Sequence, residues 1–209
     1  MWSWSSKRRE TPVPVHQPAF PANQAEKEAA VIVITGSSGS GRKKLAYQLS
    51  RETDIPYIRP YTTRVIRPNE RTGIHYHFVT EEQFDGMQKN GQFFQSVQLE
   101  RGKYGIASSD LMGAIQAKQA AIVVVNREGS LMFKRHFGDR AVRIFIYSTK
   151  EDVIVRMQQE LTPYDVIQEY LDHFTEEVHF KRECEHRVQN SDHIATIQKI
   201  KEIIGIIKH

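Results

Sequence analysis

A glycine-rich turn that follows an apolar, β-branched segment carries the clearest chemical signal in the sequence. The turn reads Gly36-Ser-Ser-Gly39-Ser-Gly41-Arg42-Lys43. A strand, such a turn and a helix in this order form the phosphate-binding loop with the pattern GxxxxGK[ST]. Here Arg42 stands where the pattern has its lysine, and Lys43 stands where the pattern has the hydroxyl that holds magnesium. Arginine is a planar fork and lysine has no lone pair for a metal, so the sequence predicts a phosphate loop with altered chemistry.

A second group of residues that suit phosphate lies downstream. Arg64 and Arg67 are three positions apart, and Tyr76 and Tyr104 follow. Two arginines in one loop can offer forked donors to a phosphate, and two phenols add hydroxyl donors. Taken alone, such a loop can equally be a solvated pair of arginines beside two core tyrosines. His75 and His77 share the spacing of one strand face, but two histidines do not make a metal site, and no metal site is predicted.

The elements that position these residues alternate between strand and helix. We expect a strand at residues 31–34, a helix at 42–52, strands at 121–125 and 142–147, a helix from 151 that pauses at 158–163, and a last helix near the C-terminus. Residues 57–106 have short alternating segments and one helix at 81–89, which predicts a small β-rich subdomain inserted in the frame. Strands that alternate with helices predict an α/β fold with a doubly wound parallel sheet.

Composition restricts the class of protein. The chain of 209 residues has a net charge of +4, and its basic residues form no long stripe, so we expect an anionic partner and no nucleic acid. The first 30 residues hold half of the eight prolines and no apolar period, which predicts a disordered or loosely packed tail before a domain at 31–209. No apolar run is long enough to span a membrane, and one cysteine, Cys184, fits a reducing cytoplasm.

Residues 62–79 resemble the TTRxPRxGExxGxxYxFV signature of guanylate kinases. They read Thr-Thr-Arg64-Val-Ile-Arg67-Pro-Asn-Glu70-Arg-Thr-Gly-Ile-His-Tyr76-His-Phe-Val. The phosphate loop lies upstream, Lys103-Tyr104-Gly105 resembles the family's YYG, and residues 188–192 resemble its VxND. The resemblance covers roughly residues 31–208 and implies a P-loop fold of the nucleoside-monophosphate-kinase type.

The resemblance implies that the phosphate-binding half of a GMP site is kept and that its guanine-binding half is replaced. The residues that match the family's phosphate ligands are all kept: Arg64, Arg67, Tyr76 and Tyr104. The residues that match its guanine readers are replaced by Gln95, Ile106, Val124 and Asn126. A carboxylate accepts both N–H groups of the guanine edge, whereas an amide does so only in part and Ile or Val not at all. We therefore expect base recognition to be lost.

The resemblance also implies a lid at residues 156–170 in which the family has an RGRGT motif and an IxxR motif. No arginine occupies either motif here, although Arg156 lies one turn earlier. Arginines of this kind neutralise the transferred phosphoryl group, so the lid is predicted to be degenerate. Pro60 stands where the enzymes have serine, and guanylate-kinase-like domains of membrane-associated scaffold proteins, which bind phosphorylated peptides, carry proline there.

Together these features predict a guanylate-kinase-like module that binds a phosphorylated protein or peptide through the phosphate residues, has little or no catalysis and requires no cofactor. One alternative is a divergent guanylate kinase in which Lys43 or Lys44 replaces the missing lysine, with GMP as substrate and ATP and magnesium as cofactors. A second alternative is a structural module whose phosphate site is vestigial. Sequence leaves the oligomeric state open.

Overall fold

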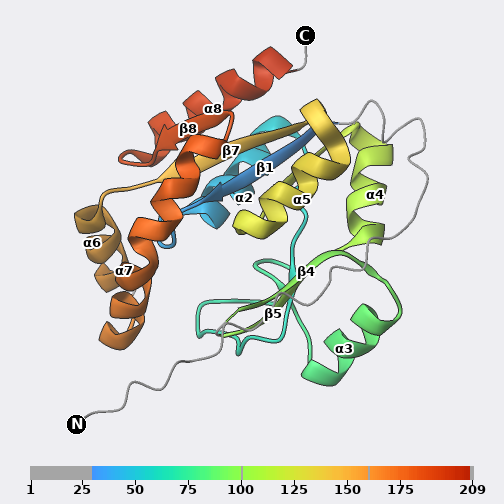
Figure 1. Ribbon diagram of the computed structural model, residues 1–209, viewed down its shortest axis with the longest axis horizontal. Coiled ribbons are helices and arrows are strands. Elements are labelled where there is room, and N and C mark those ends of the chain that lie inside the picture. The colour runs from blue at the N-terminus through green and yellow to red at the C-terminus, as the bar shows by residue number, and fades with distance from the viewer. Residues whose placement is uncertain (1–29, 100, 160, 208–209) are drawn as a thin grey trace.

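The computed structural model describes residues 30–99, 101–159 and 161–207, which form a layered α/β arrangement (Figure 1). The main sheet has four parallel strands in the order β6-β1-β7-β8. Their bounds are Ala120–Val124 for β6, Ala30–Gly36 for β1, Ala141–Tyr147 for β7 and His186–Gln189 for β8. The carboxyl ends of all four strands therefore lie along one edge, where α/β proteins place their ligands.

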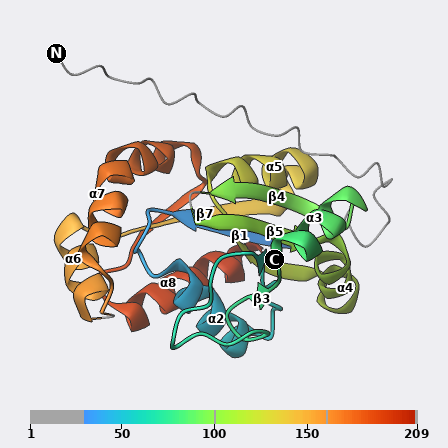
Figure 2. The ribbon, with the colours of Figure 1, turned by 90° about the horizontal axis from the view of Figure 1, so that it is seen from below.

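Helices cover both faces of the main sheet (Figure 2). On one face, α2 (Arg42–Thr53) and α8 (His193–Ile207) bury one apolar cluster against the sheet, with Leu45, Leu49 and Ile200 fully buried. On the other face, α4 (Ser108–Lys118) and α5 (Arg127–Phe137) enclose a second cluster around Phe94 and Phe133. The doubly wound parallel sheet predicted from the sequence is confirmed.

A second sheet lies beside the carboxyl edge of the first. Its order is β3-β2-β5-β4, with bounds His77–Phe78, Tyr61–Thr62, Gly102–Ala107 and Phe93–Leu99. Helix α3 (Glu81–Lys89) precedes β4 and starts at a capping box, in which Thr80 and Gln83 bond each other's backbone N–H. A β-bulge between Phe93 and Gln95 turns the Phe94 side chain into the apolar cluster that α4 and α5 enclose.

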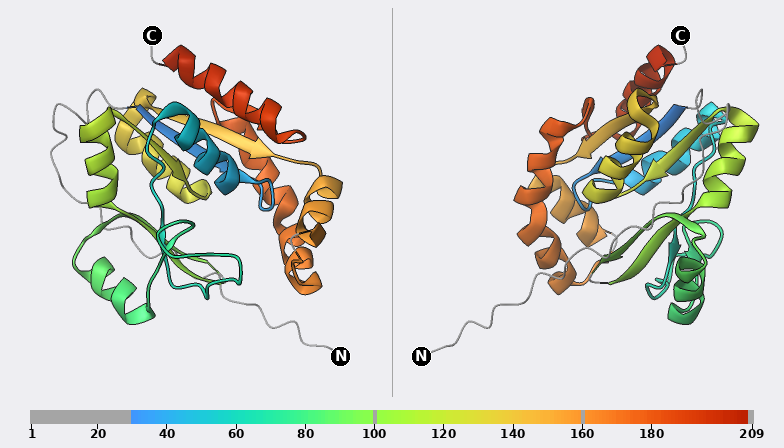
Figure 3. Two further views of the ribbon diagram at one scale, coloured as in Figure 1. Left: turned by 180° about the vertical axis from the view of Figure 1, so that it is seen from behind. Right: turned by 45° about the vertical axis from the view of Figure 1, so that its right-hand side comes forward.

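Two further helices flank the carboxyl edge on the side of β7 (Figure 3). They are α6 (Lys150–Gln159) and α7 (Tyr164–His179), followed by the short helix η2 (Phe180–Glu183). Another short helix, η1 (Gly138–Arg140), joins α5 to β7. The pause predicted between the two helices of the lid segment matches the gap between α6 and α7.

The limits of the inserted subdomain and of the lid stay predictions, since nothing in the fold tests them as separate units. Residues 1–29 of the predicted N-terminal tail lie outside the described residues, and its last predicted residue, Ala30, begins β1. Among the described residues, none of the helices combines the length and apolar character that a membrane crossing requires.

Candidate phosphate and base site

The three glycines of the phosphate loop have positive φ angles, which residues with a side chain rarely adopt. Gly36 ends β1 with φ at 139°, and a Cβ there would lie 1.8 Å from the carbonyl oxygen of Ile146. Gly39 and Gly41 have φ of 73° and 84°. A Cβ on Gly39 would lie 2.6 Å from Val153 on α6. The loop therefore needs glycine at these positions to pass between the strand end and its neighbours.

Helix α2 begins directly after this loop with its N-terminus available to an anion. Gly41 is the N-cap, no side chain caps the helix, and the first turn holds no acidic residue. Free N–H groups and the helix dipole favour negative charge at such a terminus. The hydroxyl groups of Ser37 and Ser40 are buried in the loop without a hydrogen-bond partner in the described structure. The loop keeps several donors that a phosphate could satisfy.

Residues far away in the sequence hold the loop from outside. Arg156 on α6 donates from Nη1 to the carbonyl oxygen of Gly39 at 2.9 Å and from Nη2 to that of Asn190 at 3.2 Å. Asn190, just after β8, donates from Nδ2 to the carbonyl oxygen of Ser40 at 2.7 Å. The sequence placed Arg156 only at the start of the predicted lid, one turn before its arginine motifs, and no local pattern indicates its contact across 117 positions. With these carbonyls bonded outward, the loop's shape is set before any ligand arrives.

The first two residues of α2, both basic, extend to different places. Arg42 directs Nη1 to the carbonyl oxygen of Val125 at 3.5 Å, beyond the end of β6. Lys43 places Nζ 2.8 Å from the hydroxyl oxygen of Tyr76 and 4.7 Å from the centre of the Tyr76 ring. The ammonium group of the phosphate-loop helix thus reaches the second candidate site.

Arg64 is held tightly at that second site. Its Nη2 donates to both carboxylate oxygens of Glu70 at 2.8 and 2.7 Å, and its Nη1 donates to the carbonyl oxygen of Val65 at 2.7 Å. Burial opposes the charged form of Arg64, but the bonds and charge of Glu70 outweigh it and raise the pKa of the guanidinium. Burial likewise raises the pKa of Glu70, but bonds from Arg64 and the backbone of Arg67 outweigh it and lower that pKa. Both partners are therefore ionised at neutral pH.

Aromatic rings complete the phosphate side. The guanidinium carbon of Arg64 lies 5.4 Å from the ring centre of Tyr76, and the rings of Tyr76 and Tyr104 are 5.9 Å apart. Burial raises the pKa of Tyr104, so its phenol stays protonated and can donate. Arg67 is exposed and joins the group through its backbone N–H, which donates to Glu70 at 3.1 Å.

Of the predicted phosphate residues, the structure brings together the side chains of Arg64, Tyr76 and Tyr104, with Lys43 added, whereas Arg67 contributes its backbone N–H and its side chain is exposed. Glu70 was missed as the partner of Arg64. Its position six residues later in the same loop is a signal that could have been found.

The residues at the predicted base side lie on adjoining elements. Gln95 on β4 is 5% exposed and pairs in register with Ile106 on β5, which is fully buried. Asn126 is the N-cap of α5 and accepts from the N–H of Gly129 at 3.0 Å. Val124, at the end of β6, instead packs against the apolar cluster that α2 and α8 bury on the other face of the main sheet. Gln95, Ile106 and Asn126 therefore form one neutral group, from which Val124 is separate.

The parallel sheet with a phosphate loop after β1 defines an α/β P-loop kinase-like fold. The family model of guanylate kinase matches residues 28–206, and the chain therefore belongs to the guanylate kinase family.

Individual relatives agree with this assignment. A guanylate kinase of Desulfitobacterium hafniense is 26% identical over 181 residues, which cover 86% of this chain and 90% of that protein. One of Mycoplasmoides gallisepticum is 28% identical over 184 residues, covering 86% and 94% of the two chains. The crystal structure of guanylate kinase from Anaplasma phagocytophilum has a TM-score of 0.70 and 21% identity, covers 85% of each chain and supports the fold.

These relatives correct the main functional prediction from the sequence. A phosphopeptide-binding module is the wrong conclusion, because the proteins that match along most of this chain are guanylate kinases. The prediction treated Arg42 and Lys43 as a loss of chemistry at two positions. In the structure, the Lys43 ammonium reaches the phosphate residues, so the loop still presents a compact cation there.

Proposed function

We propose that the protein is a divergent guanylate kinase that transfers the γ-phosphoryl group of ATP to GMP. The observation that carries the proposal is the 2.8 Å contact between Lys43 Nζ and the Tyr76 hydroxyl. It links the phosphate loop, which suits the ATP phosphates, to the group of Arg64, Tyr76 and Tyr104, which suits the phosphate of GMP. A lysine ammonium is a compact charge, as the chemistry of a phosphate loop requires.

In this arrangement each phosphate meets its own set of donors. The uncapped N–H groups at the start of α2 are the donors that we assign to the ATP phosphates. Arg64 and the phenols of Tyr76 and Tyr104 orient the GMP phosphate. Lys43 extends from the helix of the phosphate loop to Tyr76, and we assign to it the negative charge of the attacking and transferred groups. Positioning and charge neutralisation are the main contributions that a protein makes to phosphoryl transfer.

The step itself balances simply. An oxygen of the GMP phosphate attacks the γ-phosphorus of ATP, a new P–O bond forms, and the bond from the γ-phosphorus to the bridging oxygen of ADP breaks. GDP and ADP leave. Lys43 neutralises charge on the transferred group throughout, and Arg156 keeps the loop in place through its bonds to the Gly39 and Asn190 carbonyls.

The residue at the loop's magnesium position does not fit that metal. Lys43 has no lone pair to offer, and within residues 30–99, 101–159 and 161–207 no three His, Cys, Asp or Glu side chains gather as a metal site. The step above therefore takes nothing from a metal held by the protein. ATP as phosphoryl donor and GMP as acceptor complete the proposal.

A coupled assay of ADP release with ATP and GMP tests it. We expect GMP-dependent turnover on the order of 0.1 to 10 s⁻¹, at or below the ordinary range of kinases. Lys43→Met is expected to lower kcat at least about a hundredfold, as loss of one donor to a developing charge does. Lys44→Met is the matched control, since it removes the neighbouring charge of an exposed residue, and it should change kcat less than about threefold. No GMP-dependent turnover, or equal effects of the two variants, would overturn the proposal.

A further inference from the structure

Tyr57 is a buried tyrosine whose hydroxyl group has no hydrogen-bond partner among the residues that the structure describes. The residue is 6% exposed, and it belongs to the apolar cluster that α2 and α8 bury against the main sheet. A buried hydroxyl without a partner costs free energy, and a phenylalanine would fill the same apolar space without that cost. Packing alone therefore does not explain why residue 57 carries a hydroxyl.

The backbone around Tyr57 is bonded to the main sheet and to the phosphate-loop helix. The N–H of Ile58 donates to the carbonyl oxygen of Ile122 at 2.9 Å, which adds this short stretch to the sheet beside β6. The N–H of Tyr57 donates to the hydroxyl oxygen of Ser50 on α2 at 3.1 Å. These bonds fix Tyr57 between β6 and α2, the helix that also carries Lys43.

The next residues of the chain run beside the loop that carries Tyr76. Arg59 donates from Nε to the carbonyl oxygen of Ile74 at 2.9 Å, two positions before Tyr76. Burial raises the pKa of Tyr57 and the phenol of Tyr76 adds to this effect, while the charges of Arg59 and Arg42 oppose it. The Tyr57 hydroxyl therefore stays protonated and can donate, and it lies within electrostatic reach of the Tyr76 hydroxyl.

We propose that Tyr57 is a positioning residue whose hydroxyl donates to the Tyr76 oxygen when GMP is bound. This inference rests on the proposed function and adds a residue to its phosphate site. In the described structure, the Tyr76 oxygen accepts from Lys43 Nζ at 2.8 Å. The phosphate of GMP attracts the Lys43 ammonium and leaves the Tyr76 oxygen without that donor. A phenol that accepts one hydrogen bond donates the next one more strongly, so Tyr57 strengthens the bond from Tyr76 to the phosphate.

Calorimetry with GMP on a double-mutant cycle tests the inference without requiring turnover. Tyr57→Phe should weaken GMP binding about twofold to tenfold, the effect of one neutral hydrogen bond. In the Tyr76→Phe background the same substitution should cause no further loss, because Tyr57 acts only through the Tyr76 hydroxyl. Tyr47→Phe is the matched control, since it removes an exposed phenol hydroxyl from α2. In that background the loss caused by Tyr57→Phe should be the same as in the unmodified chain.

The melting temperature without GMP separates this role from a structural one. Tyr57→Phe removes an unpaired hydroxyl from the interior, so the melting temperature should stay the same or rise. A hydroxyl that stabilises the fold would be paired in the absence of GMP, and its removal would lower the melting temperature by several degrees. The inference therefore expects weaker GMP binding together with undiminished stability.

Three results would overturn the inference. One is a GMP affinity of Tyr57→Phe equal to that of the unmodified chain. Another is a loss of the same size with and without the Tyr76 hydroxyl. The third is a melting temperature that falls by more than about 4 °C. None of them removes the proposed phosphoryl transfer, which product formation decides. Conversely, GMP binding that depends jointly on Tyr57 and Tyr76, with no transfer from ATP, would remove the proposed function and support this inference.

Discussion

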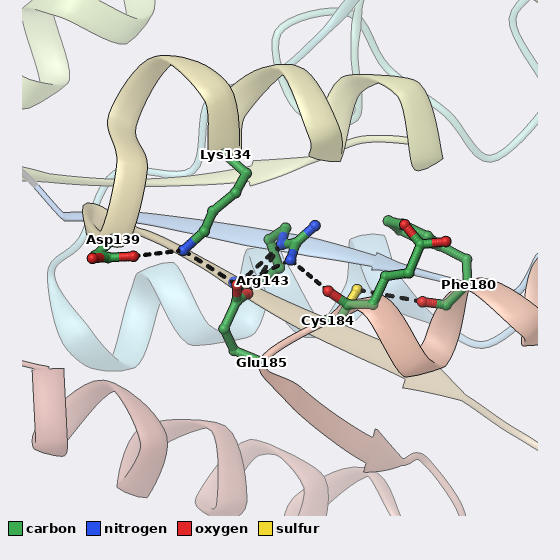
Figure 4. A network of polar contacts seen from close by, with 7 residues as sticks. Lys134, Asp139, Arg143, Phe180, Cys184 and Glu185 are labelled. Carbon is green, nitrogen blue, oxygen red and sulfur yellow. Dashed lines mark hydrogen bonds and ion pairs between the residues drawn. The ribbon is translucent and has the colours of Figure 1, made fainter.

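Two arginine–glutamate pairs of this chain are built from the same groups in very different surroundings. Arg143 on β7 donates from Nε and Nη2 to Glu185 at 3.0 to 3.3 Å, and Lys134 reaches the same carboxylate at 3.2 Å (Figure 4). Arg64 donates to both oxygens of Glu70 at 2.7 and 2.8 Å. Both arginines are about nine-tenths buried. Pairing and burial alone therefore do not distinguish a functional arginine from a structural one.

The neighbours of each pair make the difference. Around Arg143 lie the Glu183 carbonyl, the Cys184 thiol and Phe180, so the pair closes the packing of η2 against the sheet (Figure 4). Burial raises the pKa of Cys184 to about 11, which leaves the thiol protonated and unreactive. Around Arg64 lie two phenols, and the Lys43 ammonium contacts one of them. Both arginines are bonded to acceptors, but only the Arg64 pair also has phenol donors and a second cation beside it, which suits a phosphate.

The largest effect in this comparison is expected at Arg64. Arg64→Met removes charge-assisted bonds worth about 1.5 to 3 kcal/mol and should weaken GMP binding by roughly tenfold to a hundredfold in calorimetry. It also leaves Glu70 facing the phosphate, so the double variant Arg64→Met, Glu70→Gln should recover part of the loss. Unchanged GMP affinity in the single variant would place Arg64 with the structural pair.

For the pair of Arg143 and Glu185 we expect the opposite pattern, a loss of stability with no loss of GMP affinity. Burial raises the pKa of Glu185, but bonds from the side chain and backbone of Arg143 outweigh burial and lower it to about 2, from an ordinary value of 4.5. With its partial exposure discounted, the pair should contribute about 2 kcal/mol to the free energy of unfolding. Glu185→Gln should lose this amount in urea denaturation at pH 7 and leave GMP affinity unchanged. A change in GMP affinity comparable to that of Arg64→Met would break the comparison.

The pH dependence of stability sharpens the same point. Because the pKa of Glu185 is lowered by folding, its contribution is fully present above about pH 4.5 and is lost as the pH falls toward about 2. Denaturation curves at several pH values should therefore show the difference between the unmodified chain and Glu185→Gln shrinking across this window. A difference that stays constant from pH 6 to pH 3 would contradict the assigned cause of the shift.

The smallest effect is expected at the phenol that Lys43 contacts. Tyr76→Phe removes one neutral hydroxyl and keeps the ring that packs beside Arg64, so GMP binding should weaken by about 0.5 to 1.5 kcal/mol. Tyr47→Phe, on an exposed position of α2, serves as the control and should have no effect. Calorimetry on both variants measures this difference, and equal affinities would remove the Tyr76 hydroxyl from the site.

Local sequence signals predicted much of the fold. The helix expected at residues 81–89 has those bounds, because Thr80 and Gln83 form a capping box that fixes its start. The phosphate-loop helix starts at Arg42 as expected, after glycines that only a tight turn requires. The β-branched segments became the buried parallel strands β1, β6 and β7.

The chemistry of the site was harder to predict, because it depends on where long side chains end. An alignment compares residues position by position, and the family pattern has a hydroxyl residue where this chain has Lys43. Its ammonium group nevertheless meets Tyr76, which is 33 residues away. Arg156 likewise reaches the loop over 117 positions, from one turn before the predicted lid motifs. Such contacts are set by tertiary packing, and no local period or motif reveals them.

Product analysis tests the central claim most directly. The purified chain is incubated with ATP and GMP, the reaction is stopped at intervals, and nucleotides are separated by chromatography. The proposed phosphoryl transfer predicts that GDP and ADP accumulate in equal amounts and that Lys43→Met suppresses both together. ADP formed without GDP, or neither product formed from ATP and GMP, would contradict the account.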